Sequence, residues 1–281
     1  MAYTSAGQQK YMFNSESLHS KPLLLAHRGS RLLAPENTRT AFDLALSHGS
    51  DVLEIDVRLS RDHQIIVTHD DTVDRTSNGS GPVIGFTLAD LKKLNAAYRF
   101  RDLLGNHYRG KAERFMTLHE LLLDYQDTRI NIDIKDNDNT AAKVLAKLLI
   151  KTDSVHRVNV GSFHAATIQA FRQYAPMIST AATQQEVAKL YMESWLASTG
   201  QGRRNGAKPK HAFNVLQIPR YYRGLPLSTR RFISFLHQHD IPVMYWTVND
   251  PIVMRRLLES GVDGIVTDRT DLAQSVFLTH Q

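Results

Sequence analysis

The chain has 281 residues, of which 42% are hydrophobic and 22% are charged, and it contains no cysteine. This composition is ordinary for a globular protein with a full hydrophobic core, and the lack of cysteine excludes disulfides, thiolate metal sites and cysteine nucleophiles. The formal net charge of +6 favours an anionic small-molecule substrate or peripheral contact with an anionic membrane, but the positive charge is too diffuse to indicate nucleic-acid binding.

Residues 1–20 are predicted to be a polar N-terminal arm, followed by one domain over residues 21–281. The arm contains no apolar segment of the kind that a secretory signal requires. No stretch of the chain approaches the ~18 consecutive apolar residues of a membrane span. We therefore expect a cytoplasmic protein.

The first apolar run, residues 22–26, is predicted to be a strand that ends at His27-Arg28-Gly29. A helix is expected over residues 39–47, where apolar side chains recur at helical spacing before Gly49. Two further strands are expected over residues 52–58 and 64–68, because both runs are rich in valine, isoleucine and leucine.

Residues 70–116 interrupt this pattern. They are rich in turn-forming residues and contain one short predicted helix over residues 87–94, with Thr87 as its N-terminal cap and Asp90 in the capping-box position. Loops of this length inside a compact domain are usually functional. We interpret the segment as a small inserted subdomain at one end of the domain.

From residue 117 onward, helices and strands alternate regularly. The expected helices are 117–125, 139–151, 165–174, 184–196, 229–239, 251–260 and 271–278. The expected strands are 129–134, 157–161, 177–181, 213–218, 241–246 and 262–266. A polar, basic loop is expected over residues 198–211.

Such alternation predicts parallel strand pairing with right-handed crossovers. The expected fold class is therefore α/β, a TIM (β/α)8 barrel with a small inserted subdomain after the second or third strand. About nine runs resemble strands, whereas the barrel needs eight, so one of the weaker runs, 177–181 or 213–218, is expected to lie outside it. The competing architecture is a doubly wound open sheet, which would place a glycine-rich phosphate loop after the first strand. His27-Arg28-Gly29-Ser30 is not such a loop.

Two carboxylates lie two residues apart inside an apolar strand, at Glu54 and Asp56. Because side chains alternate along a strand, both point to the same face. Buried like charges are unfavourable unless a positive charge offsets them, and a hard divalent cation with oxygen ligands would do so. The alternative is a solvated carboxylate face. Asp133 and Lys135 repeat the same spacing on a later strand.

In a TIM barrel, the chemistry sits at the carboxyl ends of the strands. Polar residues at those ends include His27, Arg28, His69 and Lys135, and Trp246 ends another strand. Arginine and lysine suit a phosphate group, and two histidines suit general acid–base catalysis. Each residue alone also has an ordinary structural explanation, but together with the carboxylates they indicate metal-assisted cleavage of a phosphate ester.

A series of short motifs runs in order from about residue 22 to residue 273. The motifs are His27-Arg28-Gly29, Pro35-Glu36-Asn37-Thr38, Glu54-Ile55-Asp56-Val57, His69-Asp70, Asp74-Arg75-Thr76 with Asn78-Gly79, Asp133-Ile134-Lys135, Trp246-Thr247-Val248-Asn249 and Gly261-Val262-Asp263-Gly264-Ile265-Val266-Thr267-Asp268. In this order they resemble the motif series of the glycerophosphodiester phosphodiesterase family. The family has a TIM barrel with a small subdomain inserted after the His-Asp motif, in agreement with the segment 70–116.

The resemblance implies a metal-dependent phosphodiester hydrolase that releases glycerol 3-phosphate and an alcohol such as choline or ethanolamine. The glycerol 2-hydroxyl would attack the phosphorus, and water would then open a cyclic phosphate. The resemblance implies that His27 and His69 act as general acid and base, and that one divalent cation, Mg²⁺ or Ca²⁺, is bound by Glu54, Asp56 and Asp133. It also implies that Arg28 and Lys135 bind the phosphate and that Trp246 contacts the glycerol or head group. Many family members have glutamate at the position of Asp133, so the shorter side chain leaves the metal's identity open.

Two alternative functions are consistent with the sequence. The first is a lysophospholipase D-like activity on lysophospholipids at an anionic membrane, with contacts from residues 187–196 and the basic loop that contains Arg203 and Lys210. The second is a non-catalytic phosphate-binding barrel. The presence of both histidines and all three carboxylates favours an enzyme.

Overall fold

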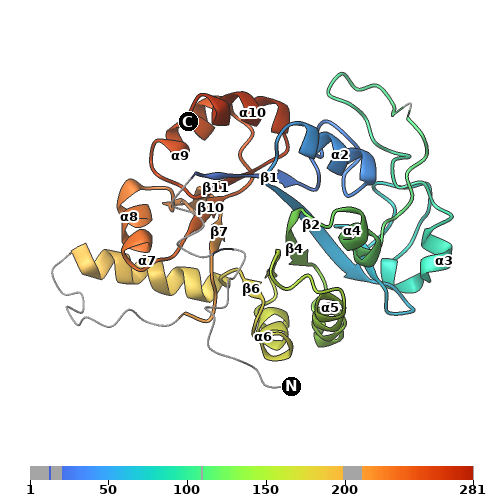
Figure 1. Cartoon of the computed structure of the whole chain (residues 1–281), viewed down its shortest axis with the longest axis horizontal. Coiled ribbons are helices and arrows are strands. Elements are labelled where there is room, and N and C mark those ends of the chain that lie inside the picture. Colours follow the sequence, from blue (N-terminus) through green and yellow to red (C-terminus); the bar gives the residue numbers. More distant parts are fainter. Residues whose placement is uncertain (1–12, 14–20, 109, 199–210, 281) are drawn as a thin grey trace.

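The computed structural model describes residues 13, 21–108, 110–198 and 211–280 (Figure 1). Apart from Phe13, the predicted N-terminal arm lies outside these residues, as does nearly all of the predicted basic loop. Phe13 is buried in an apolar cluster with Leu23, Leu25, Val215 and Met244. At least one side chain of the predicted polar arm therefore belongs to the core.

Eight parallel strands form a closed barrel. They are β1 (Leu23–His27), β2 (Val52–Leu59), β4 (Arg129–Ile134), β5 (Val158–Gly161), β6 (Ser179–Thr180), β7 (Leu216–Ile218), β10 (Val243–Tyr245) and β11 (Gly264–Thr267). Their hydrogen-bonded order runs β6-β5-β4-β2-β1-β11-β10-β7. A parallel bridge between Ala181 and Val215 joins the two ends, and the Ala182 amide donates to the Val215 carbonyl at 2.9 Å. The predicted barrel is confirmed, and the open doubly wound sheet is excluded.

The helices surround the barrel in Figure 1. They are α2 (Arg39–Ser47), α4 (Leu118–Asp124), α5 (Asn139–Lys151), α6 (Ala165–Tyr174), α7 (Gln184–Ser198), α8 (Arg230–Gln238), α9 (Pro251–Leu258) and α10 (Thr270–Leu278). Several begin at a side-chain cap, such as Thr117 with Glu120 in a capping box and Asp250 before Pro251. These caps accept hydrogen bonds from amides that the helix cannot satisfy, so the local sequence fixes where each helix starts.

One strand assignment was wrong. The strand-like run outside the barrel is neither 177–181 nor 213–218 but β3 (Ile65–Val67), which pairs antiparallel with β2. Only residues 60–64 separate β2 from β3, whereas a parallel connection needs a dozen residues or more. His69 consequently reaches the site from a hairpin that extends β2, and not from a barrel strand.

The segment between β3 and α4 has a small core of its own. It contains a 3₁₀ turn η1 (Val83–Gly85) and a single helical turn α3 (Leu88–Leu91), which is shorter than the helix expected over residues 87–94. The side chains of Val73, Val83 and Phe115 bury together against Ile66 of β3. The segment therefore packs on the hairpin beside the barrel.

A second hairpin had not been expected. Strands β8 (Tyr221–Tyr222) and β9 (Leu225–Pro226) pair antiparallel after β7. The two turn residues, Arg223 and Gly224, both have positive φ, 49° and 83°, as a two-residue type I′ turn requires. In the sequence, Gly224 indicates this turn, but the two-residue strands are too short to show the alternation of side chains that is typical of a β-strand.

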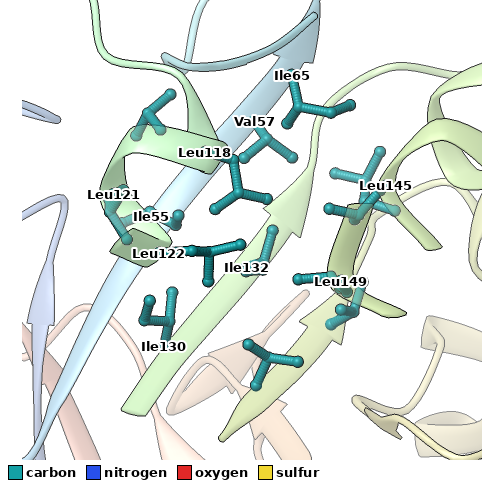
Figure 2. Close-up of a cluster of buried hydrophobic side chains, with 14 of the residues drawn as sticks. Ile55, Val57, Ile65, Leu118, Leu121, Leu122, Ile130, Ile132, Leu145 and Leu149 are labelled. Atoms are coloured by element: carbon teal, nitrogen blue, oxygen red, sulfur yellow. The ribbon is translucent and has the colours of Figure 1, made fainter. Parts of the chain in front are cut away.

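The outer core packs helices onto the sheet, as Figure 2 shows for Ile130 and Ile132 of β4 between α4 and α5. Leu145 and Leu149 of α5 lie one turn apart and are both fully buried. Apolar side chains at this spacing form the buried stripe of an amphipathic helix. Among the described residues, no helix combines the length and apolarity needed to cross a bilayer.

We expect Leu145→Ala to lower the free energy of unfolding by about 2–5 kcal/mol, because it leaves a cavity between α5 and the sheet. The matched control is Lys147→Ala on the exposed face of the same helix, which should change it by less than about 0.5 kcal/mol. Urea denaturation followed by circular dichroism measures both. Equal effects of the two substitutions would contradict the packing described here.

Candidate active site

The loop after β1 carries the first group of candidate residues. Arg28, Gly29 and Ser30 all have positive φ (51°, 74° and 75°), a conformation that non-glycine residues adopt rarely and that is often found at active sites. A side chain at Gly29 would lie 2.8 Å from both Ala41 and Phe42 of α2, so only glycine fits. The tight loop brings the Arg28 side chain back over the end of β2.

Asp56 lies at the centre of the charged groups. It is fully buried on β2, with one carboxylate oxygen 2.9 Å from Arg28 Nε and the other 2.9 Å from Lys135 Nζ. Burial alone would raise the pKa of Asp56, but the charges of Lys135 and Arg28 hold it below its ordinary value. Asp56 therefore stays ionised inside the barrel.

At Glu54 and Asp133, burial outweighs the nearby positive charges, so the pKa of each carboxylate is raised. Burial, together with the negative charge of Asp56, raises the pKa of Glu54 to about 7, and burial also raises the pKa of Asp133. Asp133 pairs directly with Asp56 in the register of β2 and β4, and its Oδ2 is 2.6 Å from Lys135 Nζ. The site thus lacks enough positive charge to keep all three carboxylates fully ionised at neutral pH.

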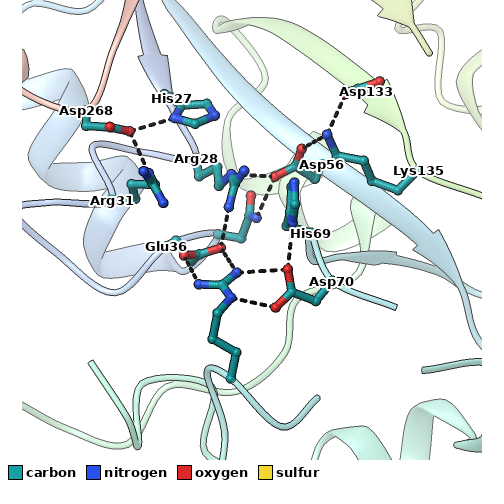
Figure 3. A network of polar contacts seen from close by, with 12 residues as sticks. His27, Arg28, Arg31, Glu36, Asp56, His69, Asp70, Asp133, Lys135 and Asp268 are labelled. Carbon is teal, nitrogen blue, oxygen red and sulfur yellow. Dashed lines mark hydrogen bonds and ion pairs between the residues drawn. The ribbon is translucent and has the colours of Figure 1, made fainter. Parts of the chain in front are cut away.

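Each candidate histidine is held through Nδ1 by an aspartate (Figure 3). His27 Nδ1 is 2.6 Å from Asp268 Oδ1, and His69 Nδ1 is 2.7 Å from Asp70 Oδ1. A carboxylate at Nδ1 fixes the ring orientation and leaves Nε2 as the nitrogen that can exchange a proton. Desolvation lowers the pKa of His69, which favours its neutral form near pH 7.

Glu36 and Arg75 link these groups into one network, and Figure 3 shows Glu36 between Arg28 and Asp70. Glu36 accepts from Arg28 at 3.0 Å and from both terminal nitrogens of Arg75 at 2.7 and 2.8 Å, while Arg75 also bonds Asp70. The segment between β3 and α4 thereby orients His69 through Asp70. The sequence motifs contain Glu36, Asp70, Arg75 and Asp268, but the sequence analysis predicts no role for them. No local pattern indicates which distant charged side chain each of them contacts.

The candidate residues share one cavity of about 630 Å³ at the carboxyl ends of the strands. Those lining it are His27, Arg28, Glu54, His69, Asp133, Lys135 and Trp246. The buried Asp56 instead holds Arg28 and Lys135 in place. Trp246 packs edge-on against Phe163 with ring centroids 5.7 Å apart, and Lys135 Nζ lies 5.5 Å from the Phe163 ring centroid. The structure thus places all eight residues predicted from the sequence at one site.

The carboxylates supply a donor set that suits a hard cation. Asp133 Oδ1 is buried without a hydrogen-bond partner, and Asp56 Oδ1 is near Lys135 but accepts no well-aligned hydrogen bond. Among the described residues, no three acidic or histidine side chains are already gathered tightly enough to hold an ion. The Lys135 ammonium lies 2.9 Å from Asp56 Oδ1 and 2.6 Å from Asp133 Oδ2. Unsatisfied carboxylate oxygens on adjacent strands fit Mg²⁺ or Ca²⁺, provided that this ammonium moves.

The sequence profile of the glycerophosphoryl diester phosphodiesterase family matches residues 27–272. A glycerophosphodiester phosphodiesterase from Caldanaerobacter subterraneus subsp. tengcongensis is 32% identical over 253 residues, covering 88% of this chain and 94% of the relative. The crystal structure of a glycerophosphodiester phosphodiesterase from Agrobacterium tumefaciens is 28% identical, covers 90% of this chain and 99% of its own, and superposes with a TM-score of 0.71.

A further solved structure, an Oleispira antarctica phosphodiesterase in complex with the product sn-glycerol-3-phosphate, is 23% identical and has a TM-score of 0.72. The alignment covers 93% of this chain and 98% of that structure. At this identity the likeness concerns the fold, which is the same closed barrel.

We expect Asp268→Asn to lower turnover at least ~10-fold, because His27 would lose the carboxylate that fixes its ring. The effect should fall on kcat more than on KM and should alter the pH profile of kcat, neither of which a purely structural role would produce. Asp271→Asn, which removes an ion pair with Arg269 on the outer helix α10, is the matched control. Equal kcat values for the two variants would argue against a positioning role for Asp268.

Proposed function

The chain belongs to the glycerophosphoryl diester phosphodiesterase family and is an enzyme of that class, and we propose that it hydrolyses glycerophosphodiesters with His27 and His69 as the general acid–base pair. The products are glycerol 3-phosphate and a free alcohol. One observation carries the proposal: a single cavity is lined by two aspartate-held histidines and by two cations that suit a phosphate.

Arg28 and Lys135 bind the phosphate in this proposal. Both line the cavity, and each forms an ion pair with the buried Asp56. An arginine held by charged partners loses little conformational freedom when it binds an anion, and its fork of donors matches phosphate oxygens. Trp246 and the adjacent Phe163 form an aromatic surface beside Lys135, which we assign to contact with the glycerol or head group.

The two histidines move protons at Nε2. One accepts the proton of the glycerol 2-hydroxyl as that oxygen bonds to phosphorus, and the other donates a proton to the head-group oxygen as its bond to phosphorus breaks. Water then opens the resulting cyclic phosphate, with the two histidines exchanging roles. Holding the hydroxyl beside the phosphate makes the attack intramolecular, which can contribute an effective molarity of ~10⁵ M or more.

Glu54, Asp56 and Asp133 would hold one divalent cation, Mg²⁺ or Ca²⁺. A bound divalent cation supplies positive charge that polarises a phosphoryl oxygen and a nearby hydroxyl. The carboxylates themselves support this assignment, since two of them have a raised pKa and two retain buried oxygens without a well-aligned hydrogen bond. A cation would favour their ionised forms.

We propose that residues 21–281 act as one domain in which the insertion at about 70–116 completes the site. Asp70 and Arg75 come from this insertion. Asp70 bonds to His69 directly, and Arg75 donates to Asp70 and to Glu36, which also accepts from Arg28. The competing hypothesis is a phosphate-binding barrel without catalysis. Such a protein would release no free alcohol from a glycerophosphodiester, which can be measured.

The assay is glycerol 3-phosphate and choline release from glycerophosphocholine. We expect turnover by the wild type, and a loss of at least ~10² in kcat for His27→Ala and for His69→Ala. The double variant should be little worse than the worse single variant, because the pair acts as a unit. A 2-deoxy analogue should bind but react very slowly. Choline release that survives in the double variant would contradict the proposal.

Metal binding can be measured apart from activity. Addition of Mg²⁺ or Ca²⁺ at about 100 times its Kd should raise the Tm of the chelator-treated protein by about 5 °C or more. Asp133→Asn should remove most of that shift, whereas Asp127→Asn, in the exposed turn before β4, should retain it. Chelator should also abolish turnover. Full activity in chelator, or an unchanged shift in Asp133→Asn, would refute this metal site.

A further inference from the structure

A row of uncharged polar side chains crosses the inside of the barrel. The Ser179 hydroxyl donates to Asn159 Oδ1, and Asn159 Nδ2 donates to Asn131 Oδ1, both at 2.8 Å. Gln217 Nε2 donates to the same Asn131 oxygen, also at 2.8 Å. The row therefore links β6, β5, β4 and β7, and the reaction described above assigns no role to any of its four members.

Two atoms at one end of this row are left without a partner. Asn131 Oδ1 accepts twice, and Gln217 Nε2 donates to Asn131 and lies 3.9 Å from Met244 Sδ. A side-chain amide has two N–H donors and one acceptor oxygen, so Asn131 Nδ2 and Gln217 Oε1 remain. Among the described residues neither atom has a hydrogen-bond partner, and neither is one of the fully buried polar atoms. A turn of all three amides by 180° would exchange the two roles and still leave one donor beside one acceptor.

Asn131 and Gln217, which we call the amide pair, both line the active-site cavity. Asn131 pairs with Glu54 in the register of β2 and β4 and precedes Asp133 by two residues, so it lies about 6.6 Å deeper in the barrel. Gly161 of β5 pairs with Asp133. A Cβ at Gly161 would lie 3.9 Å from Gln217 Oε1, and the missing side chain keeps this oxygen open to the cavity.

The surroundings of the amide pair are apolar. Ala181 lines the same cavity, and its Cβ would lie 3.4 Å from a Cβ at Gly161, while Met244 contacts Gln217 through its sulfur. In such surroundings a hydrogen bond is stronger than in water, and an unpaired polar atom is unfavourable. One free donor beside one free acceptor suits a hydroxyl group, which donates and accepts at once.

The direction of the reaction decides which substrate hydroxyl reaches the amide pair. Arg28 and Lys135 follow the carboxyl ends of β1 and β4, whereas Asn131 lies within β4. In an in-line displacement the attacking and leaving oxygens lie on opposite sides of phosphorus. The head group varies in size and must depart, so it points to the open mouth and the glycerol points inward. Because the 2-hydroxyl attacks phosphorus, the 1-hydroxyl is the one left to reach the interior.

We propose that Gln217 and Asn131 bind the 1-hydroxyl of the glycerol moiety, with Gln217 Oε1 as acceptor and Asn131 Nδ2 as donor. This inference rests on the proposed function. Asn159 and Ser179 are positioning residues, since they hold Asn131 through its oxygen. The amide pair fixes the far end of the three-carbon backbone and so holds the 2-hydroxyl beside phosphorus. It selects glycerol over a diol that lacks the third hydroxyl.

The test compares choline release from sn-glycero-3-phosphocholine and from its 1-deoxy analogue, in which a methyl group replaces the hydroxymethyl group and the attacking 2-hydroxyl remains. We expect kcat/KM to be at least ~10-fold lower for the analogue, because it leaves two polar atoms of the cavity unpaired. Gln217→Met removes the amide at nearly constant volume, and the ratio of the two kcat/KM values should fall at least ~5-fold. Gln184→Met, at the exposed start of α7 on the same cavity, is the matched control and should retain the wild-type ratio.

Damage to the fold would lower both kcat/KM values together and leave their ratio unchanged. Equal kcat/KM values for the two substrates in the wild type would overturn the hydroxyl subsite and leave the proposed function standing. A wild-type ratio that persists in Gln217→Met would overturn it too. If neither substrate were cleaved, the proposed function would fail, and calorimetric binding of sn-glycerol 3-phosphate and its 1-deoxy analogue would decide the subsite alone. Tighter binding of glycerol 3-phosphate that is lost in Gln217→Met supports it, and equal affinities reject it.

Discussion

The active site depends on the two ion pairs of Asp56. This carboxylate is fully buried on β2 and meets Arg28 from the loop after β1 and Lys135 from the end of β4, each at 2.9 Å. An ionised carboxylate without such partners would be strongly unfavourable at this position, and loss of the carboxylate would leave two cations close together. The pairs therefore fix the side chains of three adjacent strands relative to one another and set the low pKa of Asp56.

The remaining polar groups are arranged around that centre. Arg28 sits in a strained loop where Gly29 allows close contact with α2, and Glu36 ties Arg28 to Arg75 and hence to Asp70. Two histidines from different parts of the chain are each oriented by a carboxylate at Nδ1. Membership in the phosphodiesterase family agrees with this arrangement, because both histidines, Arg28 and Lys135 line one cavity.

The two halves of the barrel contribute chemically different side chains to the lining of this cavity. The first half of the barrel supplies the charged groups, whereas α7 and the β8–β9 hairpin supply apolar ones. The division follows from the closed sheet, in which β7 and β6 complete the circle opposite β1 and β2. Phosphate chemistry and recognition of the rest of the substrate can thus be set by different segments of the chain, which is how one barrel accommodates different substrates.

Much of the site could be predicted because its signals are local. Glu54 and Asp56, and likewise Asp133 and Lys135, share a face for the simple reason that side chains alternate along a strand. His27 and Arg28 follow a strand, and strand ends carry the chemistry in a parallel barrel. The assignment of the ninth strand failed because hydrophobic runs do not reveal pairing direction, although the short connection to Ile65 already excluded a parallel neighbour.

The sequence by itself determined the alternation of strands and helices, the faces on which the carboxylates lie and the order of the motifs, since all of these are set by neighbours within a few residues. Only the tertiary structure decided that Asp268 would hold His27 across 241 positions, that Glu36 would join Arg28 to Arg75, and that α7 and the β8–β9 hairpin would line the same cavity as the histidines. Those contacts arise when the barrel closes, and the partner of a charged side chain then depends on strand order and register rather than on its neighbours in the chain.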